Sequence, residues 1–149
     1  MADVDRPLNK RGKRDAPEMG KRLLKRDVHP DRILCSPAER ARATWEAFSS
    51  SLQLTAAQLN ALTYEPGIYE ASAQSLLHLV QSQDDAFSTV LLIGHNPGME
   101  TLANELSPEP VGHMPTCALV HLRFDTNHWA GIASAEPTLV YYDYPKKKP

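Results

Sequence analysis

The sequence lacks the features that mark membrane proteins, disulfide-stabilised proteins and metal-binding domains. Its longest apolar runs, such as Val90 to Ile93, fall far short of the ~20 residues needed to cross a bilayer. Residues 1–5 show no basic and apolar signal-peptide pattern, so we expect a cytoplasmic protein with no membrane contact. The only two cysteines, Cys35 and Cys117, lie in apolar stretches and are expected to be buried free thiols. No Cys/His spacing indicates a zinc site, and we expect neither metal nor cofactor.

Lysine and arginine are absent from residues 43–122, although the chain holds 16 of them. Twelve of the 16 lie in residues 1–42, so the net charge of -2 hides a cationic N-terminal third. This segment is either a solvated helix face or a positive rim that attracts anionic substrates. Nucleic-acid binding is disfavoured, because no aromatic residue interleaves with these charges before Trp45.

The remaining composition is that of one globular domain over residues 1–149, with 42% hydrophobic and 23% charged residues. Hydrophobic periodicity predicts alternating strands and helices, which favours a three-layer α/β sandwich with helices on both faces of a mostly parallel sheet. The expected strands are Arg32–Cys35, a weak one at Gln58–Thr63, Thr89–Ile93, Cys117–Phe124 and Thr138–Asp143. The expected helices begin near Asn9, Ser36, Ser72 and Pro97.

Local signals predict where two of these helices begin. Asn9 is a plausible N-cap of the first helix, and Pro17 marks either a break or a second start within it. Ser36 is suited to cap the second helix, with Pro37 in its first position and Glu39 completing a capping box.

Two strand-to-helix turns carry the residues best suited to chemistry. Arg40 is expected in the first turn of the second helix, and His95 lies at the carboxyl end of a buried strand just before another helix. Open α/β sheets bind ligands at this edge, where helix N-termini present free N–H groups to anions. A guanidinium and an imidazole that converge there would suit a phosphoryl group. Taken alone, Arg40 could equally be a surface charge and His95 a polar residue of the core.

Together the two turns resemble motifs of the histidine phosphatase superfamily. Ser36-Pro37-x-x-Arg40-Ala41-x-x-Thr44 resembles its second arginine motif, and Ile93-Gly94-His95-Asn96-Pro97-Gly98 resembles its second histidine motif. Asp5-Arg6-Pro7-Leu8-Asn9-x-x-Gly12 resembles the segment after the first active-site motif, and residues 115–146 are also similar. The resemblance is nearest to the small bacterial phosphohistidine phosphatases and implies a phosphoglycerate-mutase-like fold.

One motif of the superfamily has no counterpart in this sequence. The superfamily begins with a strand that ends in Arg-His-Gly or Arg-His-Ala, and that histidine takes the phosphoryl group covalently. No Arg-His pair occurs here. We therefore expect the first central strand to be missing between the strand that ends at Ile93 and the strand Cys117–Phe124. We also expect the chain as printed to be inactive as an enzyme.

For the complete protein, the resemblance implies a phosphohistidine or phosphoprotein phosphatase that forms a covalent phosphohistidine intermediate. Arg40 would neutralise the phosphoryl oxygens and His95 would donate a hydrogen bond to them. Arg6 and Asn96 are the further candidates for phosphate binding. The substrate would be a phosphorylated protein or a small phospho-compound, and the charge stabilisation by Arg and His requires no metal.

Other roles stay open at this point. Glu65 or Glu70 could protonate a leaving group, although a plain loop role is favoured for both. A non-catalytic relative could bind phospho-ligands or a partner protein through Arg40 and His95. An interaction module that uses the basic N-terminal helix is a third possibility. The sequence does not predict the oligomeric state.

Overall fold

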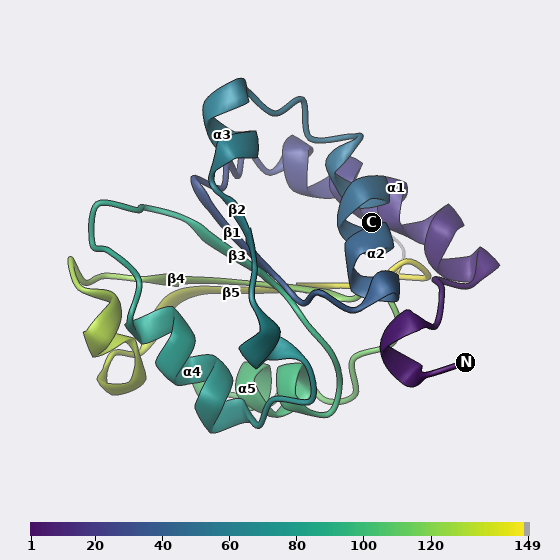
Figure 1. Cartoon of the computed structure of the whole chain (residues 1–149). Helices are drawn as coiled ribbons and strands as arrows, with labels where there is room; N and C mark the ends of the chain where they lie inside the picture. The colour runs from purple at the N-terminus through teal and green to yellow at the C-terminus, as the bar shows by residue number, and fades with distance from the viewer. Residues whose placement is uncertain (148–149) are drawn as a thin grey trace.

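The computed structural model describes residues 1–147, so positions 148 and 149 of the expected domain lie outside the described residues. The strands are β1 (Arg32–Cys35), β2 (Leu62–Tyr64), β3 (Val90–Ile93), β4 (Leu119–Phe124) and β5 (Pro137–Asp143). The α-helices are α1 (Lys10–Lys25), α2 (Glu39–Ser49), α3 (Ala56–Asn60), α4 (Ala73–Gln81) and α5 (Gly98–Leu106). Short 3-10 helices are η1 (Asp3–Asp5), η2 (Pro66–Ile68) and η3 (Trp129–Ser134). Figure 1 shows their arrangement.

A parallel sheet in the order β2-β1-β3 carries helices on both faces, as the sequence predicted. In the middle strand β1, Ile33, Leu34 and Cys35 are fully buried, which is typical of a parallel strand covered on both sides. Successive side chains of a strand point to opposite faces. Ile33 and Cys35 therefore pack against α1 and α2, whereas Leu34 packs against α4 and α5.

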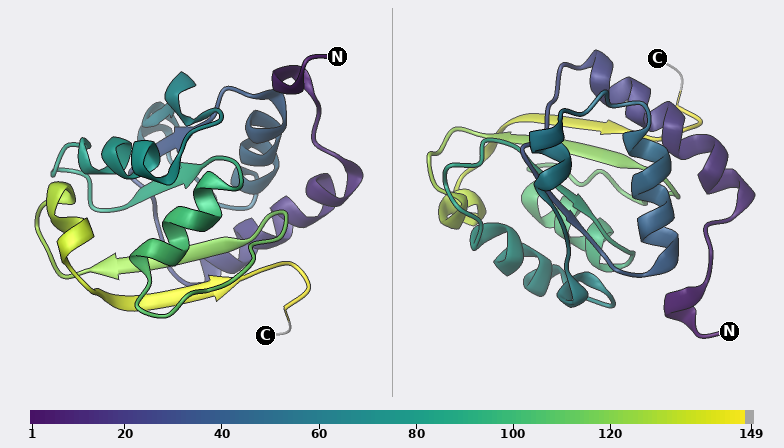
Figure 2. Two further views of the ribbon diagram at one scale, coloured as in Figure 1. Left: turned by 90° about the horizontal axis from the view of Figure 1, so that it is seen from below. Right: turned by 45° about the horizontal axis from the view of Figure 1, so that its top comes forward.

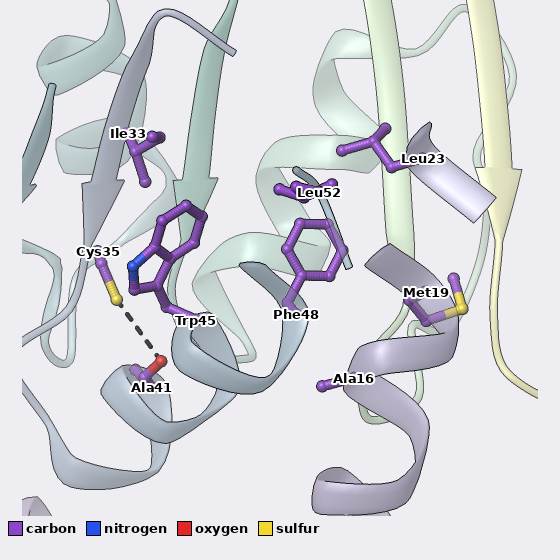
Figure 3. Packing of buried hydrophobic residues seen from close by; sticks show 9 residues of the cluster. All are labelled: Ala16, Met19, Leu23, Ile33, Cys35, Ala41, Trp45, Phe48 and Leu52. Atoms are coloured by element: carbon purple, nitrogen blue, oxygen red, sulfur yellow. Dashed lines mark hydrogen bonds between the residues drawn. The ribbon is translucent and has the colours of Figure 1, made fainter. Parts of the chain in front are cut away.

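The larger core cluster joins α1, α2 and β1. Trp45 and Phe48 of α2 lie between Ile33 of β1 and the apolar face of α1, which contributes Met19 and Leu23 (Figure 3). These side chains are almost fully buried, and burial of each apolar side chain of this size stabilises the fold by about 1.5–3 kcal/mol. The core thus fixes α2, and with it the turn that carries Arg40, against the carboxyl end of β1. Across the described residues, no helix combines the length and apolar character needed to cross a bilayer.

Three local expectations are settled by the structure. Asn9 caps α1 by accepting a hydrogen bond from the Gly12 amide, and the helix continues through Pro17 without a break. The expected capping box of α2 is wrong, because α2 begins at Glu39 after an Ala38 N-cap, and the Ser36 hydroxyl bonds the Ala38 amide and His95 instead of an amide within the helix. The expected strand Gln58–Thr63 is wrong over its first half.

The first half of the expected strand belongs instead to helix α3, and only Leu62–Tyr64 pairs with β1. The helix begins with a capping box between Thr55 and Gln58, in which each side chain bonds the other's backbone amide. These reciprocal hydrogen bonds satisfy two free amides at the helix start and favour a helix over an extended strand.

The sheet is broken between β3 and β4, at the place where the sequence analysis expected a missing strand. Among the described residues, β3 pairs only with β1, and β4 pairs only with β5 in a separate antiparallel ribbon (Figure 2). Two cavities of about 600 and 750 Å³ lie along this break, and Leu91, Leu92 and Leu119 line both. We call this space the β3–β4 slot. Apolar side chains line it, and within residues 1–147 the edges of β3 and β4 that face it have no paired strand.

Candidate functional site

His95 lies at the carboxyl edge of the parallel sheet, directly after β3 and Gly94. Its Nε2 is 2.7 Å from the hydroxyl oxygen of Ser36, which directly follows β1 and is fully buried. Cys35 and Ile93 are paired in the register of the two strands, so the residues that follow them emerge at the same edge. Sequence reasoning missed Ser36 as a partner of His95. The signal was that two strands expected to be parallel neighbours are each followed, within two residues, by a polar side chain: Ser36 after β1 and His95 after β3.

The environment of His95 favours its neutral imidazole. Burial, followed by the positive charge of Arg40, lowers the pKa of His95 below its ordinary value of 6.5. Asp3 acts in the opposite direction, and its effect is smaller. When the Ser36 hydroxyl donates to Nε2, the neutral ring carries its proton on Nδ1 and can donate from that side. In this tautomer His95 is a neutral hydrogen-bond donor beside a cationic group.

Arg40 and Arg6 converge on one carboxylate, that of Asp3 in η1. Arg40 lies 3.3 Å from Asp3 Oδ2 through Nη2 and donates from Nη1 to the Asp3 carbonyl oxygen at 2.9 Å. The Nε of Arg6 lies 3.3 Å from Asp3 Oδ1. The Tyr69 hydroxyl also donates to Asp3 Oδ2. The predicted arginines therefore do meet, and they meet around an anion.

Tyr69 links this cluster to His95. The two rings are in edge-to-face contact, with centroids 5.6 Å apart and planes at 88°. Tyr69 follows η2 at the carboxyl edge of the sheet. Its hydrogen bond to Asp3 is the main cause that raises the pKa of Tyr69, with burial second. Sequence reasoning did not identify Tyr69, because a tyrosine in a short loop carries no periodic signal.

All four predicted site residues line the cavity of about 750 Å³, which is the part of the β3–β4 slot nearest to this edge: Arg6, Arg40, His95 and Asn96. The Asn96 side chain, however, is engaged in structural bonds. Its amide nitrogen donates to the Met114 carbonyl at 2.9 Å, and its oxygen accepts from the Glu100 amide at 3.2 Å. Asn96 thus ties the start of α5 to the loop before β4, and its role in phosphate binding stays a prediction.

The two candidate acids lie at opposite ends of η2. Glu65 precedes η2 and donates its backbone amide to the Cys35 carbonyl at 2.8 Å. Glu70 is exposed beside Tyr69, in a left-handed backbone conformation with φ of 56°. Neither carboxylate has a hydrogen bond or ion pair within the described part of the chain, and their acid role stays a prediction.

The remaining histidine of this cavity is His113, which is exposed and paired through Nδ1 with Glu100 Oε1 at 2.9 Å. Within residues 1–147 the structure holds no group of three or more His, Cys, Asp or Glu side chains arranged to hold a metal ion. Cys35 and Cys117 are free thiols, as expected, and burial raises their pKa to about 12 and about 11. Cys117, expected to be buried within a strand, is only half-buried; it precedes β4 and lines the cavity of about 750 Å³. Neither thiol is activated as a nucleophile.

Comparison with known proteins places the site in context. A family model of the histidine phosphatase superfamily (branch 1) matches residues 2–104. An uncharacterised protein of Mycobacterium tuberculosis is 30% identical over 156 aligned residues, which cover 98% of this chain and 93% of that protein. An uncharacterised chloroplast protein of Arabidopsis thaliana is 28% identical, over 87% of this chain and 61% of that protein.

Solved structures show the same fold. A protein of Nakamurella multipartitia assigned as the phosphohistidine phosphatase SixA superposes with a TM-score of 0.78 at 27% identity, over 99% of this chain and 89% of that one. Its counterpart from Agrobacterium tumefaciens gives a TM-score of 0.71 at 29% identity, over 82% and 80% of the two chains. A protein histidine phosphatase SixA in complex with tungstate gives a TM-score of 0.77 at 24% identity, over 97% and 87%, a likeness of fold alone.

Proposed function

Because this chain belongs to the histidine phosphatase superfamily (branch 1), we propose that it forms the phosphate-binding body of a phosphohistidine-type phosphatase. Its structural neighbours of the SixA type support a phosphatase-like function and confirm the resemblance seen in the sequence. The observation that carries the proposal is the convergence of Arg6, Arg40 and His95 on one cavity at the carboxyl edge of the sheet. The substrate class is a phosphorylated protein or a small phospho-compound.

In this proposal each residue acts on the oxygens of the phosphoryl group. Arg40 and Arg6 neutralise the negative charge, which the planar guanidinium does through paired N–H donors. His95 donates a hydrogen bond to an oxygen whose charge grows in the transition state. Ser36 is a positioning residue, because its hydroxyl fixes the orientation of the His95 ring. Charge stabilisation of this kind proceeds without proton transfer from these groups.

The nucleophile in this proposal is a histidine on a strand that fills the β3–β4 slot. The unpaired edges of β3 and β4 and the apolar lining of the slot support this placement. A strand parallel to β3 would end beside Ser36 and His95, where the superfamily has its Arg-His motif. Its imidazole nitrogen would attack phosphorus as the P–N bond of the substrate breaks, and the departing imidazole would take up a proton. Water would then hydrolyse the phosphorylated histidine and regenerate the nucleophile.

The test uses what we call the extended chain: this sequence preceded by an apolar strand that ends in Arg-His and a short polar loop. We expect the extended chain to hydrolyse a phosphohistidine peptide. A matched extension that ends in Arg-Ala should seat the same strand and show no turnover. Equal hydrolysis by both extensions, or by neither when both are folded, would contradict the proposal.

One observation favours a second function. Arg6 and Arg40 already converge on the Asp3 carboxylate in a chain that contains no Arg-His pair. Such a protein would bind phospho-ligands or a phosphorylated partner without hydrolysing them. Saturable binding of phosphate by the extended chain, with no hydrolysis of phosphohistidine, would favour this alternative.

A further inference from the structure

The Asp3 carboxylate occupies the centre of the arginine cluster. It faces both guanidinium groups and the Tyr69 hydroxyl, and it lies close enough to influence the titration of His95. A carboxylate surrounded by two guanidiniums and a phenol is bound as an oxyanion would be, through charge-assisted hydrogen bonds. The site is therefore occupied by an anion that belongs to the chain itself.

The Asp3 carboxylate is held in its charged form. The hydrogen bond from Tyr69 is the main cause that lowers the pKa of Asp3, and the positive charges of Arg40 and Arg6 act in the same direction. At neutral pH the side chain is thus a full anion, matched to the cationic groups around it.

The segment that carries Asp3 is suited to leave the site. Helix η1 is only three residues long and contains no buried residue, and the Asp3 side chain is 50% exposed. It lies over the start of α2 (Figures 1 and 2). Within the described residues, the hydrogen bonds and ion pairs that hold η1 to the rest of the fold are those of Asp3 to Arg40 and Tyr69, and a solvated anion can replace them. Its displacement would uncover Arg6, Arg40 and Tyr69 together.

We propose that Asp3 is an internal competitor for the phosphoryl group, and that Tyr69 is a third donor to that group once Asp3 has left. This inference rests on the proposed function, because it assigns the same cavity to the same class of ligand. A phosphoryl group carries more charge and one more terminal oxygen than a carboxylate, so it makes an additional contact to His95 that Asp3 lacks. The internal carboxylate keeps the arginines in their binding arrangement and excludes weaker anions.

The test compares inorganic phosphate binding by the full chain and its variants, measured by calorimetry or by chemical-shift titration. Asp3→Asn should bind phosphate on the order of 10-fold more tightly. When Asp3 occupies the site, phosphate cannot bind, so the apparent affinity rises with the fraction of molecules whose site is open. Asp5→Asn is the matched control. Asp5 lies in the same 3-10 helix, is exposed and carries the same charge, and its side chain has no hydrogen bond or ion pair within the described residues. If Asp3→Asn and Asp5→Asn change the affinity equally, the competitor role is wrong.

Tyr69→Phe tests the donor role and is best read in the Asp3→Asn background. There the competing carboxylate is gone, so loss of the hydroxyl should weaken phosphate binding by about 5- to 10-fold. An unchanged affinity would show that Tyr69 binds only Asp3. Near-ultraviolet circular dichroism of each variant verifies that the fold is retained.

Failure of this inference is distinguishable from failure of the proposed function. Hydrolysis of phosphohistidine by the extended chain, with equal phosphate binding by the Asp3→Asn and Asp5→Asn variants, would overturn the inference alone. Tighter binding by Asp3→Asn without hydrolysis would uphold the competitor and overturn the phosphatase. No phosphate binding by any folded variant would overturn both.

Discussion

The Nε2 of His95 lies 2.7 Å from the hydroxyl oxygen of Ser36, and this contact joins the ends of two adjacent parallel strands. It also brings a half-buried imidazole into the cavity that Arg6 and Arg40 line. Fixed in this way, His95 is preorganised to donate to an anion. Preorganised donors stabilise a transition state without reorganisation at the moment of reaction.

The first prediction concerns His95 itself. In the extended chain, His95→Ala should lower kcat for a phosphohistidine peptide by about 10²–10³, the usual effect of removing one preorganised donor to a developing anion. His29→Ala is the control, because His29 is exposed and pairs with Asp27 away from the cluster. Near-normal turnover in a folded His95→Ala protein would contradict the role.

Ser36→Ala should change turnover through His95, whereas loss of the hydrogen bond from the Ala38 amide to the Ser36 oxygen should change stability. We expect a loss of kcat of roughly 10-fold, the size of one lost side-chain hydrogen bond of about 1.4 kcal/mol. The effect should vanish in a His95→Ala background, where no ring remains to be oriented. Steady-state kinetics of the two single variants and the double variant measures this coupling. Additive losses would mean that Ser36 contributes independently of His95.

Arg40→Lys should not behave as a conservative change, because lysine lacks the planar fork that grips two phosphoryl oxygens. Turnover by the extended chain and inhibition by phosphate or vanadate should weaken together. Arg42→Lys is the matched control on the same helix, since Arg42 is exposed and its guanidinium stacks on the Tyr64 ring. Unchanged phosphate affinity in Arg40→Lys would show that Arg40 is only a surface charge and does not bind the phosphoryl group.

Stability should fall on mild acidification. Burial is the main cause that lowers the pKa of both His95 and His121 in the fold. The unfolded chain therefore binds protons more readily as pH falls below the ordinary value of 6.5, and the free energy of unfolding decreases until the lowered folded pKa is reached. Urea unfolding at several pH values checks this. His95→Asn should flatten part of the slope, and an unchanged slope would show that His95 is not the group responsible.

The β3–β4 slot predicts a large difference in stability between the two forms of the chain. An added strand would fill about 4.8 Å of sheet width and pair with the facing edges of β3 and β4. Without it, each buried backbone group left unpaired lowers the free energy of unfolding by about 1–3 kcal/mol. We expect the 149-residue chain to aggregate more readily and to melt at a lower temperature than the extended chain. An extension of the same length with polar residues in the strand should give no stabilisation. Identical melting of the chain with and without the apolar extension would contradict this account of the slot.

Much of the fold and part of the site could be predicted from the sequence. Short apolar runs predicted β1 and β3, and the two strand-to-helix turns predicted Arg40 and His95, because the carboxyl ends of parallel strands share one edge. The expected burial is correct for β1 but wrong for β3, whose four residues are only partly buried beside the β3–β4 slot. The break in the sheet was expected from the absent Arg-His motif. These features depend on local pattern and on general rules of α/β topology.

The rest depends on contacts between segments distant in the sequence. Ser36 matched a capping box by spacing, but in the fold its hydroxyl reaches His95, 59 residues further along the chain. Tyr69 and Asp3 meet across 66 residues, and no periodicity predicts that meeting. The short segment that begins at Gln58 has a pattern that fits a strand or a helix. The reciprocal hydrogen bonds between Thr55 and Gln58 favour the helix.

The most direct test of the central claim is the intact mass and phosphorylation site of the extended chain, quenched with base during turnover of a phosphohistidine peptide. We expect one phosphoryl group on the histidine of the added strand, with more of this species when Arg40 and His95 are intact. A phosphoryl group on His95 or His113, or phosphorylation and hydrolysis by the 149-residue chain without the strand, would contradict it.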